Sequence, residues 1–202
     1  MHFYRPSEGH RLAHDPFNSI VAPRPIGWVS TLSATGVRNL APYSFFNAFN
    51  YHPPIVGFAS IGFKHSVANI AATAEFTWNL VTRPQAEQMN ATSATVRGDI
   101  DEFDLAGLAA EPSSEIRPER VAGAPVSFEC VLTQLVQLHD RGGHPIETWL
   151  SLGEVVGVHI DDALIIDGSY DPTGARPVLR AGGPTAYYEI TPETRFDMVR
   201  PP

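Results

Sequence analysis

Lys64 and Ser66 lie where an apolar run ends and a helical pattern begins, in the segment Gly62-Phe63-Lys64-His65-Ser66. The first amides of a helix lack partners within the helix and carry a partial positive charge, which favours an anion. Lys64 adds a full positive charge and Ser66 adds a hydroxyl, so the segment could hold a phosphomonoester. The residues alone leave an alternative open, in which Ser66 caps the helix and Lys64 is solvated.

Short polar side chains are mixed with aromatic ones in residues 23–60. Strands that only fill a core alternate apolar residues with freely solvated polar residues. Here hydroxyl and amide side chains sit beside aromatic residues, a mixture that suits a flat ligand with heteroatoms along its edge. The residues concerned are Ser30, Thr31, Ser44, Asn47 and Asn50.

Motifs for several other chemistries are absent from the sequence. It contains no Gly-rich dinucleotide fingerprint, no P-loop, no Gly-x-Ser-x-Gly elbow and no HExxH helix. His139, His144 and His159 do not have the spacing of metal ligands on one helix face. Arg24 is a second candidate cation for a phosphate, with a surface ion pair as its alternative.

The composition is typical of one globular domain with a sizeable core. The chain has 202 residues, of which 43% are hydrophobic and 18% charged. Its net charge of -8 disfavours nucleic acid and anionic membranes as general partners. The single cysteine, Cys130, excludes an internal disulfide and is expected to be a small core residue. No secretory signal and no apolar run of about 20 residues is visible, so we expect a cytoplasmic protein.

Turn and periodicity signals predict a mostly antiparallel β protein. Strands are expected at 26–32, 37–40, 44–50, 54–61, 76–81, 126–138 and 148–160, with a short one at 187–190. Helical spacing predicts helices at 66–74 and 84–93 and a short one at 16–21. Pro42 should lie at a sheet edge or bulge, because it cannot donate to a ladder. Six or seven strands with few helices favour a closed β-barrel over a doubly wound sheet.

Four blocks of the sequence, in order, resemble the flavin reductase-like family: PRPIGWVSTLSATGVRNLAPYSFFNAFNYHPPIV, GFKHSVANIAATAEFTWNLV, PQAEQMNATS and GEVVGVHIDDAL. The similarity runs from about Arg24 to Tyr188, and the first block is the most specific. The resemblance implies the FMN-binding split β-barrel fold, a Greek-key barrel of about six antiparallel strands with peripheral helices. It also implies a homodimer that binds FMN non-covalently at the dimer interface.

The resemblance also implies which residues bind the cofactor. Positions that match the strands facing the isoalloxazine ring are Ser30, Thr31, Ser44, Phe45, Asn47 and Ala48. Lys64 and Ser66 match the family's Lys/Arg-x-Ser/Thr phosphate element, and His65 stands between them where relatives often carry an acidic residue. The C-terminal run from Gly182 to Tyr187 is similar to relatives too, and segment 161–202 is a candidate for the dimer interface.

What the resemblance implies about function is an FMN-dependent oxidoreductase. It would transfer hydride from NADH or NADPH through bound FMN to free flavin or another small acceptor, with a monooxygenase as a candidate partner. Flavin supplies the redox chemistry, which fits the absence of catalytic acid–base motifs. The alternatives are a flavin-binding carrier or sensor and a small-molecule-binding barrel without flavin; FAD in place of FMN stays open. We expect one domain over 1–202, with an N-terminal extension at 1–22 and a surface excursion at 97–124.

Overall fold

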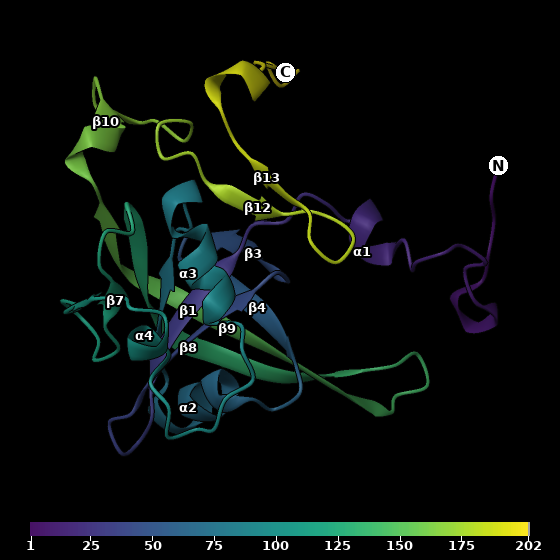
Figure 1. Cartoon of the computed structure of the whole chain (residues 1–202), viewed down its shortest axis with the longest axis horizontal. Coiled ribbons are helices and arrows are strands. Elements are labelled where there is room, and N and C mark those ends of the chain that lie inside the picture. Colours follow the sequence, from purple (N-terminus) through teal and green to yellow (C-terminus); the bar gives the residue numbers. More distant parts are fainter. Residues whose placement is uncertain (202) are drawn as a thin grey trace.

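A seven-stranded antiparallel sheet forms the body of the protein in the computed structural model, which describes residues 1–201 (Figure 1). The strand order is β2-β1-β5-β8-β9-β4-β3. The strands are β1 (Gly27–Leu32), β2 (Arg38–Tyr43), β3 (Phe46–Tyr51), β4 (Pro54–Ile61), β5 (Glu75–Asn79), β8 (Val126–His139) and β9 (Pro145–Ile160). The predicted antiparallel architecture is confirmed, and Pro42 lies on the edge strand β2 as expected.

The two edge strands of this sheet are neighbours in sequence. Only Ser44 and Phe45 separate the end of β2 from the start of β3. An extended chain advances about 3.3–3.6 Å per residue, so this link cannot cross a flat sheet whose strands are about 4.8 Å apart. The sheet must therefore curl until its edges approach each other. Within residues 1–201 no ladder joins β2 to β3, so the barrel is split, as the resemblance implies, rather than closed.

Strand β1 is buried on both faces and lies between two hydrophobic clusters. On one face Trp28 packs in a cluster with Leu40 and Phe103. On the other face Val29 packs in a cluster with Phe58. Successive side chains of a strand point to opposite faces, so a single apolar strand supplies both clusters. Because both faces of β1 are buried, its sequence does not alternate apolar residues with solvent-exposed polar residues.

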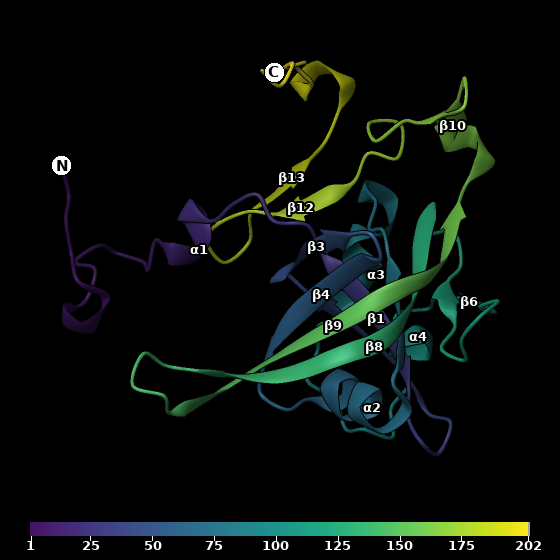
Figure 2. The same ribbon diagram turned by 180° about the vertical axis from the view of Figure 1, so that it is seen from behind.

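The helices are short and peripheral. The longest, α2 (His65–Thr73), buries Val67 and Ile70, which the helical spacing predicts. In both views it lies at the end of the sheet away from β12 and β13 (Figures 1 and 2). The remaining helices are α1 (Phe17–Ile20), α3 (Ala86–Ala91) and α4 (Glu102–Leu105), with 3-10 turns at Pro6–Glu8, Arg83–Gln85, Asp162–Leu164 and Pro192–Thr194. The helix expected at 84–93 is thus a 3-10 turn followed by α3.

Residues 97–124 take part in the core, contrary to the surface excursion expected from their polarity. Phe103 and Val121 are buried in the same cluster as Trp28. Only a few apolar residues of this segment reach the core. The segment is therefore polar on average, and that average wrongly indicates an exposed loop. Their burial joins the segment to β1 and brings α4 close to β2.

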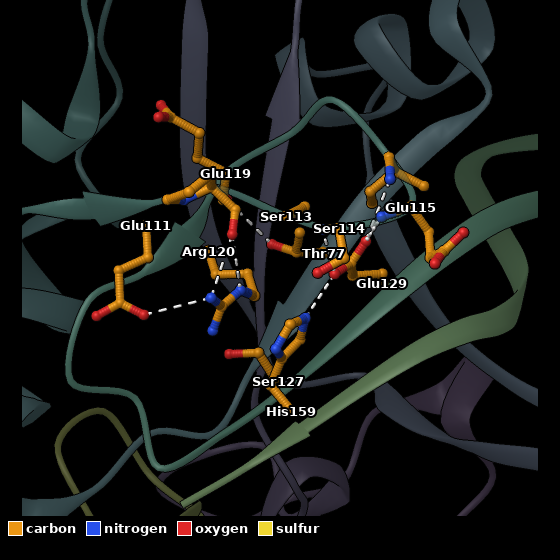
Figure 3. Close-up of polar contacts among 12 residues, drawn as sticks. Thr77, Glu111, Ser113, Ser114, Glu115, Glu119, Arg120, Ser127, Glu129 and His159 are labelled. Carbon is orange, nitrogen blue, oxygen red and sulfur yellow. Dashed lines mark hydrogen bonds and ion pairs between the residues drawn. The ribbon is translucent and has the colours of Figure 1, made fainter.

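A single buried carboxylate holds part of this segment in place (Figure 3). Glu129 of β8 is fully buried and accepts hydrogen bonds from the amides of Ser114, Glu115 and Ile116 at 2.8, 2.7 and 3.1 Å. Its other contact is His159 of β9, whose Nε2 lies 2.5 Å from Glu129 Oε1. One side chain of the sheet therefore fixes three consecutive amides of the loop.

The rest of the chain extends from the sheet as short ladders and extended segments. The hairpin of β8 and β9 and the N-terminal segment both reach away from the body in both views (Figures 1 and 2). The two-stranded ladders are β6 (Ala110–Glu111) with β7 (Arg120–Val121), β10 (Ile165–Ile166) with β11 (Ser169–Tyr170), and β12 (Val178–Arg180) with β13 (Tyr187–Glu189). Among residues 1–201, no helix combines the length and apolar character that a membrane crossing requires.

Candidate functional site

A pocket of about 290 Å³ opens beside the start of helix α2. Its walls come from strand β2, the segment that precedes and begins α2, the segment 92–96 after α3, and helix α4. The 92–96 segment is tied to the sheet because Nε1 of Trp28 donates to Oγ1 of Thr92 at 3.0 Å. The lining residues are Asn39, Ala41, Pro42, Tyr43, Phe63, Lys64, His65, Ser66, Thr92, Ser93, Ala94, Thr95, Val96 and Glu102.

The start of α2 presents positive charge to this pocket. Lys64 is the N-cap residue, its side chain is exposed, and it forms no ion pair within residues 1–201. No side chain caps the amides of the first turn. The uncapped helix end and the unpaired ammonium are both donors for an anion. Exposed His65 follows Lys64 on the pocket wall.

Ser66 does not cap the helix, which corrects the alternative given for it. Its side chain is buried, and Oγ donates to Oδ1 of Asn39 at 2.7 Å. A hydroxyl can donate only one hydrogen bond, and Ser66 donates it to Asn39. Ser66 therefore has no hydrogen left for a ligand, and it is also hydrogen-bonded to the phenol of Tyr43.

Asn39 connects the polar network under the pocket, and it is not among the site residues predicted from the sequence. Its Oδ1 accepts from Ser66 and, at 3.3 Å, from Oγ1 of Thr31. Its Nδ2 donates to Oε1 of Glu102 at 2.8 Å. Thr31 in turn accepts from Nδ2 of Asn69 on α2 at 3.0 Å. The signal available in the sequence is an amide side chain inside a predicted strand, where Asn is uncommon.

Glu102 brings a carboxylate to the pocket wall from a segment that appeared unrelated in the sequence. Only 3% of the residue is exposed, and its Oε2 accepts from the amide of Leu40 at 3.1 Å. Burial raises the pKa of Glu102, while hydrogen bonds from Leu40 and Asn39 oppose that rise. Burial likewise raises the pKa of Tyr43 on the adjoining wall, against hydrogen bonds with Ser66 and Ser60, so its phenol stays protonated near neutral pH.

The other predicted cofactor residues lie outside the pocket lining. Ser30 is buried in β1, and its Oγ has no partner within the described chain. Ser44 and Phe45 are half-buried in the link between β2 and β3, while Asn47 and Ala48 are exposed on the edge strand β3. The structure therefore groups Lys64, His65 and Ser66 in the pocket, places Thr31 beneath it, and sets the remaining five residues apart.

Arg24 is not a surface ion pair, which corrects the alternative given for it. It is buried, and its guanidinium donates to the carbonyls of Asn18, Val21, Ser44 and Ala181. Burial, and to a lesser extent the nearby charge of Arg180, lower its pKa. Because these carbonyls occupy its donors, Arg24 joins the N-terminal segment, the β2–β3 link and the C-terminal segment.

Two other hollows are less suited to an anion. One of about 430 Å³ contains Arg38, but this cation is paired with Asp101, Asp104 and Glu119. The other, of about 530 Å³, lies between α1 and the loop before β13 and has no charged residue in its lining. Within residues 1–201 no group of three or more His, Cys, Asp or Glu side chains is placed to hold a metal ion.

Comparison with known proteins supplies the family context. Residues 20–174 match the model of the flavin reductase like domain. An uncharacterized protein of Aquifex aeolicus is 36% identical over 172 residues, covering 81% of this chain and 83% of that protein. Nitrilotriacetate monooxygenase component B from Bacillus cereus has a similar structure, with a TM-score of 0.87, 26% identity and 98% of each chain covered. The 2-nitrobenzoate 2-nitroreductase NbaA of Pseudomonas fluorescens gives a TM-score of 0.79 at 28% identity, covering 91% of this chain and 88% of that one.

Proposed function

We propose, from the premise that this chain belongs to the flavin reductase-like family, that it is an FMN-dependent oxidoreductase. In this proposal hydride passes from NADH or NADPH through bound FMN to free flavin or another small acceptor. The Bacillus cereus neighbour is a monooxygenase component, which supports a monooxygenase as a candidate partner. The nitroreductase neighbour supports a small organic acceptor as the other candidate.

The observation that carries the proposal is the uncapped start of α2 beside an unpaired lysine. A phosphate monoester needs donors and positive charge, and both are present here in a chain whose net charge is -8. Lys64 and the first amides of α2 would bind the phosphate. The residues therefore fit the phosphate end of FMN.

The isoalloxazine ring would lie outside the pocket. Pockets that enclose drug-sized ligands measure about 300–1,000 Å³, and this one, at about 290 Å³, has room for only part of a flavin nucleotide. Beyond the pocket, strand β2 leads directly into the half-buried link of Ser44 and Phe45 and then to the exposed Asn47 and Ala48. These residues are our candidates for the ring, with a second copy of the chain covering it in a homodimer.

The protein's own part in the reaction would be to bind and orient. Bound flavin supplies the hydride chemistry, so no catalytic acid or base is assigned in this chain. Lys64 would anchor one end of the cofactor, and Tyr43 and Pro42 would form a wall beside it. Backbone amides and hydroxyls along the link are suited to charge that develops on a ring, because preorganised dipoles need no rearrangement during the reaction.

Anaerobic mixing with NADH or NADPH tests this function. Protein loaded with FMN should lose its visible absorption when either nucleotide is added, and air should restore the yellow colour. A yellow protein that neither nucleotide reduces would instead be a carrier or sensor. A colourless protein that FMN does not restore would contradict flavin binding altogether.

Replacing Cys130 with serine should affect stability rather than function. Cys130 is fully buried in the cluster around Phe58, and burial raises the pKa of its thiol, which keeps it protonated. A serine hydroxyl without a partner there should lower the free energy of unfolding by about 1–3 kcal/mol. Urea titration measures this loss, and NADH oxidation at low temperature should remain close to the wild-type rate. Loss of turnover in a folded variant would contradict the assignment.

A further inference from the structure

We propose that Glu102 determines ligand specificity by accepting a hydrogen bond from a hydroxyl group of the polyol chain that joins the flavin ring to its phosphate. This inference rests on the proposed function and adds to it a requirement for a hydroxylated linker. Glu102 is distant in sequence from every cofactor position that the family resemblance implies.

Glu102 is a buried carboxylate with no ion-pair partner among the described residues, although charge on the nearby His65 would favour its ionised form. Its neighbours on and before α4, Asp101 and Asp104, are both paired with Arg38. Glu102 itself forms no ion pair within residues 1–201, and its partners are two neutral donors, the amide of Leu40 and the side chain of Asn39. A carboxylate offers about four lone-pair sites, so these two hydrogen bonds leave it able to accept more. It is also part of the pocket wall.

The buried carboxylate in the pocket lining, when ionised, can only accept hydrogen bonds. Asn39 accepts a hydrogen bond from Ser66 with its Oδ1, and its NH2 group donates to Glu102. This arrangement fixes the orientation of the Asn39 amide. If the amide were flipped, its oxygen would face the carboxylate oxygen of Glu102, and two acceptors would repel each other. Ser66 is satisfied within the protein, because it is hydrogen-bonded to Asn39 and to the phenol of Tyr43. Glu102 is left with free lone pairs, which repel a phosphate and favour a hydroxyl donor.

The two ends of the pocket therefore differ in polarity. Donors lie at the rim, where Lys64 and the first turn of α2 are found. The acceptor Glu102 lies at the floor, where only 3% of the residue is exposed. A phosphate attached to a chain of hydroxyl groups matches both ends. A phosphate on a plain alkyl chain would leave the remaining lone pairs of Glu102 without a donor, which is unfavourable.

The alternative is that Glu102 only anchors α4 to the edge strand β2. An anchor would affect all ligands of the folded protein equally. A hydrogen bond to the linker would affect only ligands that carry hydroxyl groups. The ratio of two affinities, measured on the same variant, separates these roles and is insensitive to a reduced folded fraction.

The test compares riboflavin, which carries the polyol chain, with lumiflavin, which lacks it. Wild-type protein should bind riboflavin at least about tenfold more tightly, as expected for a hydrogen bond to a charged group. Glu102→Ala should bring this ratio close to one, and Glu102→Gln, whose amide is a weaker acceptor, should reduce it severalfold. Asp104→Asn is the matched control, since Asp104 is an exposed acid on the same helix and should leave the ratio unchanged.

A second measurement uses only wild-type protein and so does not depend on the variants folding. FMN should bind at least about tenfold more tightly than a flavin whose phosphate is carried on an unhydroxylated alkyl chain. Equal affinities for those two ligands would overturn the inference, as would a riboflavin-to-lumiflavin ratio that Glu102→Ala leaves unchanged or that Asp104→Asn also lowers. In these cases flavin still binds and the proposed function survives. If wild-type protein binds no flavin at all, both fail together.

Discussion

Replacing Lys64 and Ser66 together by alanine is expected to weaken FMN binding by about 2–4 kcal/mol, roughly 30- to 700-fold in Kd. Most of this loss should come from Lys64→Ala alone, because Lys64 is exposed and unpaired while the Ser66 hydroxyl already donates to Asn39. Ser66→Ala should act indirectly, by leaving Asn39 without one of its donors. Quenching of FMN fluorescence on titration with protein measures each affinity.

Arg141→Ala is the matched control for the loss of a positive charge. Arg141 is an exposed cation in the turn between β8 and β9 and is not part of the pocket lining. Its removal changes the net charge by the same amount as Lys64→Ala and should leave the Kd within about twofold of wild type, since exposed distant charges are screened. Equal effects of Lys64→Ala and Arg141→Ala would show that the phosphate binds elsewhere.

Glu129→Ala should lower the free energy of unfolding by about 3–5 kcal/mol, the largest stability effect we expect from one substitution. Three loop amides and the His159 ring would lose their acceptor at a fully buried position (Figure 3). Denaturant titration measures the loss. Glu115→Ala is the control, because the Glu115 side chain is exposed and its amide, which bonds to Glu129, is kept; its effect should stay within about 0.5 kcal/mol. A Glu129→Ala protein as stable as wild type would show that the loop is held by other contacts.

The same carboxylate predicts a pH dependence of stability. Burial alone would raise the pKa of Glu129, but hydrogen bonds from His159 and the amides of Ser114, Glu115 and Ile116 outweigh it, and the pKa lies below its ordinary value. A lowered pKa in the folded state adds stability that is fully present above the unfolded value of about 4.3 and is lost as the pH falls through the folded value. Unfolding measured between pH 7 and pH 3 should show this loss in wild type, and Glu129→Gln should lack that component.

Much of the fold follows from local signals in the sequence. Strand β4 has the predicted bounds, since its apolar run begins directly after Pro53 and ends before Gly62. Helix α2 begins one residue earlier than predicted, which is within the usual uncertainty of helix ends. Strands β2 and β3 were less well placed. The strand expected at 37–40 is too short, because an edge strand tolerates a proline and β2 continues through Pro42 to Tyr43.

The polar network of the candidate site could not be predicted in the same way. Glu102 and Asn39 are 63 residues apart, and only the folding of segment 97–124 onto the sheet brings them together. Ser66 has a residue type and position that suit a helix cap, yet a tertiary partner holds its hydroxyl instead. Local sequence patterns identify the positively charged start of α2. The acceptor Glu102 reaches the same pocket only through long-range packing.

A crystal structure of the protein grown with FMN tests the central claim most directly. The account predicts the phosphate within hydrogen-bond distance of Lys64 Nζ and the first amides of α2, with the polyol chain running past Glu102. It would be contradicted by a flavin whose phosphate lies at another surface while Lys64 points into solvent.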